Sequence, residues 1–174
     1  MTAPQLLTAD AAMQQAKDAT GLKDFGPPGI EPRLERTLEA FSRVPLTDGE
    51  VGKVNAKAVL DLSNRLRIEA WCAERPEIER QPIESPVLVV GMPRTGTTAT
   101  VGMLALDERF RFLRAWEAGS PVPPPVAGEE DSDPRCMAAR EAAKAYAMSH
   151  MHLHNPDGPE EDLAMLAALD MRAY

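Results

Sequence analysis

The predicted fold depends on one stretch of sequence, PVLVVGMPRTGTT, which spans residues 86–98. Its four consecutive apolar residues, 87–90, are bounded by proline and glycine. This pattern is typical of a strand buried on both faces of a parallel sheet. A tight turn over residues 91–96 follows, and residues 97–106 have a helical pattern. The stretch therefore predicts a strand–loop–helix unit of an α/β fold.

The loop of this unit has the features of an anion-binding site. A strand that leads through a glycine-bearing loop into a helix points several backbone N–H groups, and the positive helix end, at one spot. Gly91 and Gly96 permit close approach of the backbone. Thr97 and Thr98 add hydroxyl groups, and Arg94 adds a permanent charge whose planar donors suit phosphate or sulfate oxygens. An ordinary turn with two threonines at the helix start is the alternative.

The same loop differs from that of nucleoside triphosphatases. A Walker A loop places a lysine directly after its second glycine, where it reaches the β- and γ-phosphates. Thr97 stands at that position here, and Arg94 is the strong cation of the loop. The sequence also shows no acidic residue that can be assigned to magnesium. A kinase or nucleoside triphosphatase with a degenerate loop is therefore kept as an alternative, for which magnesium-dependent ATP binding is the test.

The rest of the chain reads as mostly helical, with 87–90 as its one clear parallel-type strand. Residues 1–85 are predicted to form a helical region, and residues 86–174 the first part of a nucleotide-binding domain. Helices are expected over 9–20 and 48–74, the latter opened by a capping-box pattern at Thr47 and Glu50. Another is expected to run to about residue 43, with Pro32 in its first turn. Within that helix Asp61, Arg65 and Glu69 follow one another at four-residue spacing, which is interpreted as a solvated charged face.

The composition is that of a globular protein and argues against a nucleic-acid-binding or membrane-spanning one. The 174 residues carry a net charge of −8, with 44% hydrophobic and 26% charged residues, as is usual for globular proteins. The acidic balance argues against a nucleic-acid partner, which requires a basic surface. No apolar run approaches the ~20 residues of a membrane span, and no secretory signal is visible, so a cytoplasmic location is expected. The two cysteines match no metal or disulfide pattern.

Residues 93–98, PRTGTT, are similar to the 5′-phosphosulfate-binding loop of sulfotransferases, whose core reads P-[KR]-[ST]-G-T-T. Residues 115–117, the proline run at 121–125 and residues 154–163 resemble a bacterial subgroup, so the resemblance covers roughly residues 47–174. It implies a P-loop-like, three-layer α/β fold and 3′-phosphoadenosine 5′-phosphosulfate (PAPS) as the sulfuryl donor, with no metal. Family members are longer and bind the 3′-phosphate further downstream. The chain is therefore expected to be the N-terminal portion of such a fold, incomplete and inactive alone.

The resemblance also implies roles for individual residues. Arg94 would hold the 5′-phosphate or the transferring sulfuryl group, and the N–H groups of Thr95, Gly96, Thr97 and Thr98 would cradle the 5′-phosphate. The acceptor is a hydroxyl or an amine of a small molecule, a glycan or a lipid, and its proton requires a base. Glu117 is the first candidate, because tyrosylprotein sulfotransferases place a catalytic glutamate at a similar position. A rim carboxylate without a catalytic role is the alternative.

A second candidate base is His154. His150, His152 and His154 alternate along the chain, so a strand would place them on one face. Three interpretations stay open: a structural role, a role of His154 as base or acceptor contact, and a zinc site completed by the acidic residues 160–162. A further alternative to an enzyme is a non-catalytic module that binds a partner through residues 1–85, with the edges of strand 87–90 exposed. The oligomeric state is left open.

Overall fold

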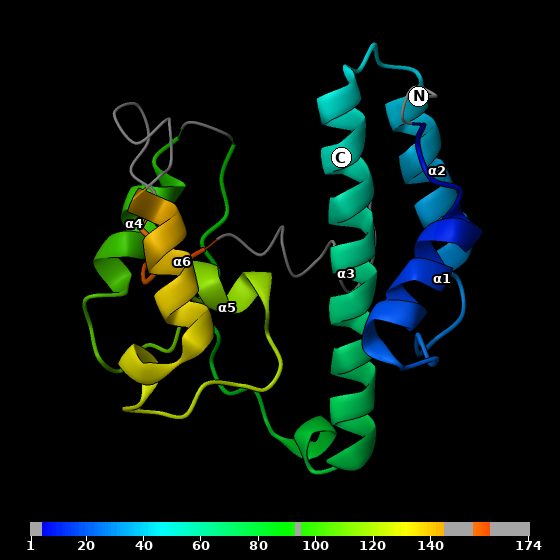
Figure 1. The fold of residues 1–174 in the computed structure, drawn as a ribbon. Coiled ribbons are helices and arrows are strands. Elements are labelled where there is room, and N and C mark those ends of the chain that lie inside the picture. Colours follow the sequence, from blue (N-terminus) through cyan, green and yellow to red (C-terminus); the bar gives the residue numbers. More distant parts are fainter. Residues whose placement is uncertain (1–4, 93–94, 145–154, 161–174) are drawn as a thin grey trace. The chain divides into compact units, whose positions relative to one another are not determined.

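The computed structural model describes residues 5–92, 95–144 and 155–160 of the chain. The chain divides into two compact units, with a boundary between Glu79 and Arg80. The first unit contains the helices α1 (Ala9–Thr20), α2 (Ile30–Ser42) and α3 (Asp48–Glu74), and a short 3₁₀ helix, η1 (Ile78–Arg80), lies at the boundary (Figure 1). The predicted boundary between two domains, at residues 85 and 86, is not tested by this division into compact units and stays a prediction.

Local capping signals determine where the helices of the first unit begin and end. The Thr8 hydroxyl accepts a hydrogen bond from the Ala11 amide at 3.2 Å, and Gly21, at φ 71°, ends α1 in the left-handed conformation. At the start of α3 the Thr47 hydroxyl and the Glu50 carboxylate each accept from the other residue's amide. The predicted helices over 9–20 and 48–74 are confirmed with these boundaries.

The predicted helix with Pro32 in its first turn is confirmed as α2. Gly29 precedes the helix with φ 108°, a backbone conformation that residues other than glycine rarely adopt. This turn lets the helix begin at Ile30, and Pro32 then lies in the first turn, where its missing N–H has no helical partner to lose.

The core of the first unit consists of small residues on α1 packed against larger ones on α2 and α3. Ala12 and Ala16 on α1 are fully buried, as are Leu34 on α2 and Leu62 and Leu66 on α3. Alanine has only a methyl group, so the helix backbones can come close while the leucines fill the space between them. The Asn55 side chain adds a polar tie, because it accepts from the Leu7 amide and donates to the Gln5 carbonyl, both at 2.9 Å.

The predicted solvated face of α3 is wrong. Asp61 and Arg65 are both only 6% exposed. The Arg65 guanidinium donates through Nε to the Phe25 carbonyl at 2.5 Å and lies 3.4 Å from the Glu69 carboxylate. Sequence spacing placed these residues on one face, but it could not show that the loop between α1 and α2 returns to cover that face and needs a donor for its carbonyl.

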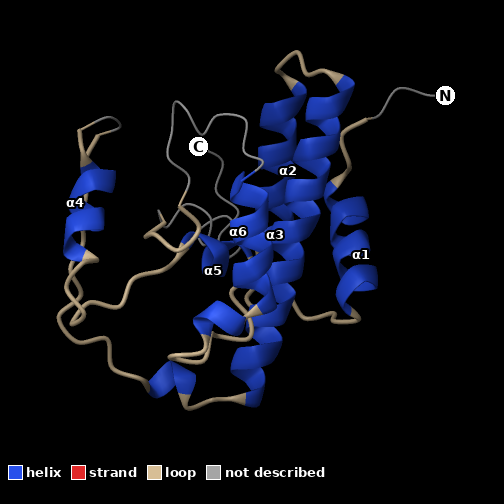
Figure 2. Cartoon of the chain, turned by 60° about the vertical axis from the view of Figure 1, so that its left-hand side comes forward, coloured by secondary structure: helices blue, strands red, loops and turns tan. Residues whose placement is uncertain are grey.

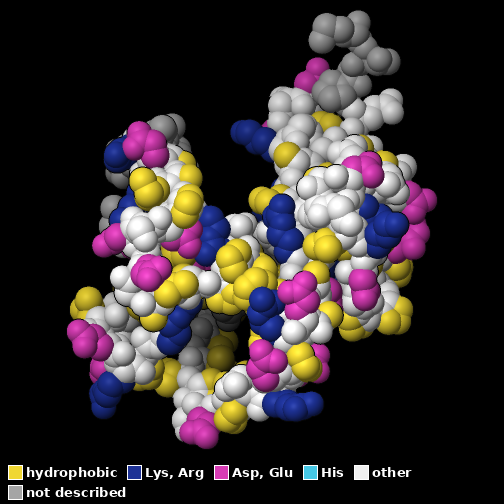
Figure 3. Space-filling model, turned by 60° about the horizontal axis from the view of Figure 1, so that its bottom comes forward, with side chains coloured by type: hydrophobic (Ala, Val, Ile, Leu, Met, Phe, Trp, Pro, Cys, Tyr) yellow, Lys and Arg dark blue, Asp and Glu magenta, His cyan; other side chains and the backbone are white. Residues whose placement is uncertain are grey.

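The second unit is built from short helices joined by irregular segments. It contains α4 (Thr97–Leu104), α5 (Ala115–Gly119), the 3₁₀ helix η2 (Glu130–Ser132) and α6 (Pro134–Lys144). Helices α5 and α6 pack together, and their buried residues include Trp116, Ala118 and Cys136. Figure 3 draws side chains of both units, and on the face that it shows acidic and basic side chains are interspersed with exposed apolar ones.

The predicted strand over residues 87–90 is not confirmed. Among the described residues no strand is formed, and Figure 2 draws only helices and loops there. Val87, Leu88 and Val90 are 56%, 77% and 89% exposed. A parallel strand exists through hydrogen bonds to a neighbouring strand, and the described part of the chain places none beside this segment. The three-layer fold is likewise not established by these residues.

The buried carboxylate of Asp61 generates a stability prediction. Burial raises the pKa of Asp61, and the Lys57 ammonium, 2.6 Å from Oδ2, opposes that shift only in part. A raised folded pKa means that stability is lost as the pH rises through it. Asp61→Asn is therefore expected to raise the melting temperature at pH 7 but not below about pH 3, where aspartate is protonated in either state. The exposed Asp18→Asn is the control, and a lower melting temperature for Asp61→Asn at pH 7 would contradict the prediction.

Candidate functional site

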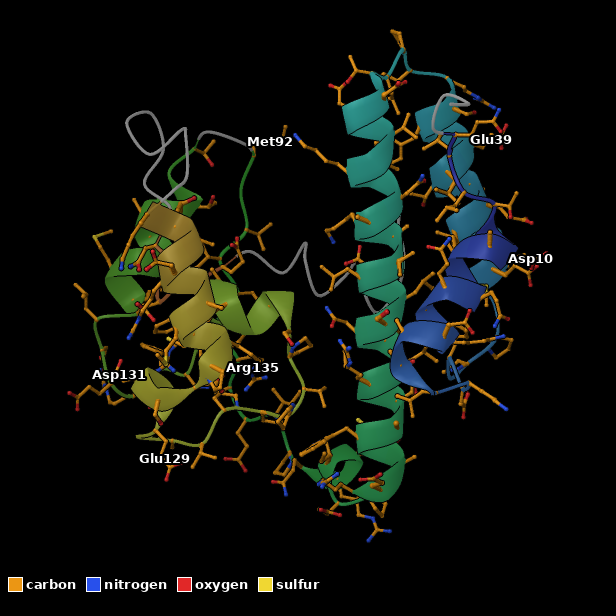
Figure 4. The ribbon with its side chains drawn as sticks, viewed as in Figure 1. Asp10, Glu39, Met92, Glu129, Asp131 and Arg135 are labelled. Carbon is orange, nitrogen blue, oxygen red and sulfur yellow. The ribbon has the colours of Figure 1, made fainter. Side chains whose placement is uncertain are left out.

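The glycine-rich loop leads from the extended segment 86–92 into α4. Gly91, Met92 and Thr95–Thr98 belong to the described residues, whereas Pro93 and Arg94 lie outside them. Met92 lies at the end of the extended segment (Figure 4). Its carbonyl accepts from both the amide and the hydroxyl of Thr95, at 3.3 and 2.6 Å. These two hydrogen bonds to one carbonyl oxygen hold Thr95 close to Met92.

Both glycines of the loop are required by its geometry. A Cβ atom on Gly91 would lie 2.7 Å from the Thr95 hydroxyl oxygen and 2.8 Å from the Thr97 methyl carbon, so both threonine side chains would have to move to admit one. Gly96 adopts φ 92° and directly precedes the first residue of α4. The loop backbone at Gly91 thus lies close against the side chains of Thr95 and Thr97.

The start of α4 supplies the polar groups of this loop. The first amides of a helix have no partner inside it, so those of Thr97 and Thr98 are oriented as donors at the positive end of the helix. The Thr97 side chain is half-buried and Thr98 is exposed. The Gly96 carbonyl, by contrast with these amides, has partners inside the helix: it accepts from the amide and the hydroxyl of Thr100, at 3.0 and 3.1 Å. The described part of the loop is therefore suited to bind an anion.

Glu117, the first candidate base, lies in a different setting. It is on α5 and its side chain is 3% exposed. Oε2 accepts from Arg111 Nη2 at 2.6 Å and from the Arg114 amide at 3.4 Å, and Oε1 accepts from Arg114 Nη1 at 3.5 Å. The spacing of Arg114 and Glu117 is that of a helix N-cap and its third residue, a local signal that could have predicted one of these contacts.

The segment Asn155–Glu160 is held against the start of α5. The Ala115 and Trp116 amides donate to the Gly158 and Pro156 carbonyls at 3.1 and 3.2 Å, so the first amides of α5 are satisfied from outside the helix. The Glu160 amide donates to the Leu113 carbonyl at 2.9 Å. These three hydrogen bonds join residues 40 or more positions apart, and no local sequence pattern indicates them.

A second polar cluster joins this segment to α6. Asp157 accepts from Arg140 Nε at 2.8 Å and from the buried Cys136 thiol at 3.3 Å, and Arg140 also binds Asp131 at 2.7 Å. The hydrogen bond from Arg140 lowers the pKa of Asp157. Burial, aided by the neighbouring Asp157, raises the pKa of Cys136. Cys136 is therefore a neutral, structural thiol.

Arg135, in the first turn of α6, organises the proline-rich loop (Figure 4). Its Nη1 donates to the Ser120 and Pro123 carbonyls at 2.8 and 2.6 Å, while Nη2 binds Asp133 at 2.6 Å. The hydrogen bond from Arg135 lowers the pKa of Asp133 to about 2. The guanidinium also lies 5.1 Å from the centre of the Trp116 ring, which is buried as a core residue.

The histidines, including the second candidate base His154, lie outside the described residues, and so do Glu161 and Asp162 of the predicted zinc set. Within the described ranges no group of three histidine, cysteine or acidic side chains could hold a metal ion. None of the helices in those ranges has the length and apolar character of a membrane span.

Comparison with known proteins assigns the family. The model of a family described as "Sulfotransferase family" matches residues 86–174, just over half of the chain and the whole of the loop region. The chain belongs to the sulfotransferase family. A search of curated proteins gave no match for this sulfotransferase sequence.

Two solved sulfotransferases have a similar structure. Sulfotransferase STF9 from Mycobacterium avium matches with a TM-score of 0.84 and 28% identity, over 97% of this chain and 45% of that one. Sulfotransferase STF1 from Mycobacterium tuberculosis H37Rv matches with a TM-score of 0.80 and 25% identity, over 95% of this chain and 48% of that one. The chain thus has a sulfotransferase fold over its length and spans less than half the length of either structure.

The surroundings of Gly91 in the loop and of Gly102 in α4 predict different effects when each glycine is replaced by alanine. Gly91→Ala is expected to displace the side chains of Thr95 and Thr97, with changes in amide chemical shifts across residues 91–98, because the added carbon overlaps both. Gly102→Ala, inside α4 and with open space around its Cβ position, is expected to stabilise the chain by roughly 0.5–1 kcal/mol. Nuclear magnetic resonance and thermal unfolding measure the two effects. Unchanged shifts in the loop of Gly91→Ala would contradict the packing described.

The Asp133–Arg135 pair predicts a pH dependence. Because the folded pKa of Asp133 is depressed to about 2, its stabilising contribution is present above the unfolded value of about 3.9 and is lost as the pH falls through the folded value. Asp133→Asn is expected to unfold at a lower temperature than the unmodified chain at pH 7 and to match it near pH 2. A difference in melting temperature that stays constant between these pH values would show that the charge is unimportant.

Proposed function

We propose that the chain provides the donor-binding part of an enzyme that moves a sulfuryl group from PAPS to a hydroxyl or amine of an acceptor. The observation that carries the proposal is the loop at residues 91–98. Its backbone at Gly91 lies so close to the side chains of Thr95 and Thr97 that a Cβ atom there would displace them, and the loop leads into the start of α4. Membership of the sulfotransferase family supports the same chemistry.

The residues of the loop fit the donor's 5′-phosphosulfate. PAPS supplies the sulfuryl group together with a phosphate that departs as the leaving group. The N–H groups of Gly96, Thr97 and Thr98 would hold the 5′-phosphate, with the hydroxyls of Thr97 and Thr98 as further donors. The Thr95 N–H, predicted to join them, already donates to the Met92 carbonyl. Arg94 would hold the 5′-phosphate or the sulfuryl oxygens through its planar guanidinium. Preorganised donors of this kind stabilise charge where it develops during transfer.

Positioning and electrostatic stabilisation carry most of the work in such transfers, as in phosphoryl transfer. The chain's remaining chemical task is to accept the acceptor's proton. Glu117 and His154 are the two candidates for this base. The acceptor belongs to the classes expected from the sequence, a small molecule, a glycan or a lipid, with no nucleic-acid partner, and the reaction is placed in the cytoplasm.

The finer fold assignment is also part of the proposal. We infer that residues 87–90 form a parallel strand of a P-loop-like, three-layer fold, with sheet neighbours that the described residues do not contain. The exposed apolar side chains of Val87, Leu88 and Val90 support this, because a strand inside such a sheet is apolar on both faces. The matched sulfotransferases are more than twice as long as the part that this chain covers.

The test is binding of the reaction's nucleotide product, adenosine 3′,5′-bisphosphate, and of PAPS, by calorimetry. Arg94→Ala is expected to weaken PAPS binding by roughly 10- to 100-fold, because it removes a charge-assisted hydrogen bond of about 1.5–3 kcal/mol. Arg109→Ala is the matched control, since Arg109 is exposed and paired with Asp107 at 2.6 Å. Unchanged affinity in Arg94→Ala would overturn the role of Arg94. Tighter binding of magnesium-ATP than of PAPS would favour a kinase instead.

A further inference from the structure

Glu117 is one of the most deeply buried charged residues among those described, at 2% exposure. Moving a carboxylate out of water is costly unless positive charge and hydrogen bonds replace the lost hydration. Two guanidinium groups do this here, from Arg111 on one oxygen and from Arg114 on the other. Both arginines precede α5, within six residues of Glu117 in the sequence.

The contacts of Glu117 continue into a row of ionic side chains. Arg114 also binds Glu130 at 3.2 Å, and the second oxygen of Glu130 accepts from the Gly128 amide at 2.8 Å. The row therefore runs from Arg111 through Glu117 and Arg114 to the loop before η2. The backbone of Arg114 pairs with Pro159 in an antiparallel bridge, so the same residue also meets the segment 155–160.

This arrangement is poorly suited to a general base. A base must come within hydrogen-bond distance of the proton that it removes. Both oxygens of Glu117 already accept hydrogen bonds from arginine, and 3% of the side chain is exposed. Arg111, by contrast, is 64% exposed beyond the pair. The side chain that reaches the surface is the guanidinium, and the carboxylate lies behind it.

We infer that Glu117 is a positioning residue that acts through Arg111 and Arg114, and that another group accepts the acceptor's proton. This rests on the proposed sulfuryl transfer. Glu117 fixes the two guanidiniums, and through Arg114 it fixes the junction of residues 110–114, α5 and the segment 155–160. That segment directly follows His154 in the sequence.

A double-mutant cycle, measured by thermal unfolding, tests the coupling of Glu117 with Arg111 without requiring turnover. Glu117→Gln is expected to lower the melting temperature by about 10 °C, because it leaves two guanidiniums without their buried counter-charge. Arg111→Gln is expected to cost less, and the double variant should be clearly less destabilised than the sum of the single variants. The exposed Glu129→Gln is the matched control and should unfold like the unmodified chain. Additive effects of Glu117→Gln and Arg111→Gln would overturn the inference.

The pH dependence of transfer separates positioning from proton removal. If Glu117 positions the arginines, Glu117→Gln keeps an acceptor oxygen for them, retains the rise of kcat with pH, and stays within about 10-fold of the unmodified kcat. If Glu117 is the base, its replacement removes that rise and lowers kcat by about 10²- to 10⁴-fold, which would overturn the inference whatever the unfolding cycle shows. Should the unmodified chain bind PAPS without turning over, as expected of an incomplete fold, the unfolding cycle alone decides the role of Glu117.

Discussion

Buried charges must be paired, and both units of this chain are organised around that constraint. In the first unit the buried Arg65 satisfies the Phe25 carbonyl and meets Glu69. In the second unit the buried Glu117 is enclosed by Arg111 and Arg114. With only eight aromatic residues, counting two tryptophans, two tyrosines and four phenylalanines, the chain has few large side chains for its core. Arginine, with its long apolar stem and five donors, connects loops to helices in their place.

The same use of arginine explains the irregular second unit. Short helices such as α5 contribute little stability of their own. Arg135 holds the carbonyls of the proline-rich loop, Arg140 holds Asp157, and Arg114 connects Glu117 with Glu130. Each guanidinium joins segments that have no common secondary structure. The loop before α4 is different, because it depends on the absence of a side chain at Gly91. The chain therefore combines a loop whose shape depends on its backbone with a scaffold held by ion pairs.

Helix boundaries and the loop motif could be predicted because their causes are local. The caps at Thr8, Gly21 and Thr47 act over a few residues, and they set α1 and α3 as expected. The conformation of the PRTGTT loop likewise depends on residues close together in the sequence. The motif predicted an anion site and indicated the family. The helix around Pro32 also formed as expected, and the left-handed conformation of Gly29 sets its start at Ile30. The residues predicted to carry the reaction were found by motif, and Arg94 and His154 keep their predicted roles as proposals.

What the sequence alone determined was therefore short in range: the helices of the first unit, the glycines and threonines of the loop, and the sulfotransferase resemblance. Tertiary structure decided the rest. It showed that Asp61 and Arg65 on α3 are buried, that no partner strand pairs with 87–90 in the described part of the chain, and that Glu117 faces two arginines. The physical reason is that burial and sheet pairing depend on residues far apart in the chain, and composition and spacing carry no information about which distant segment will cover a given face.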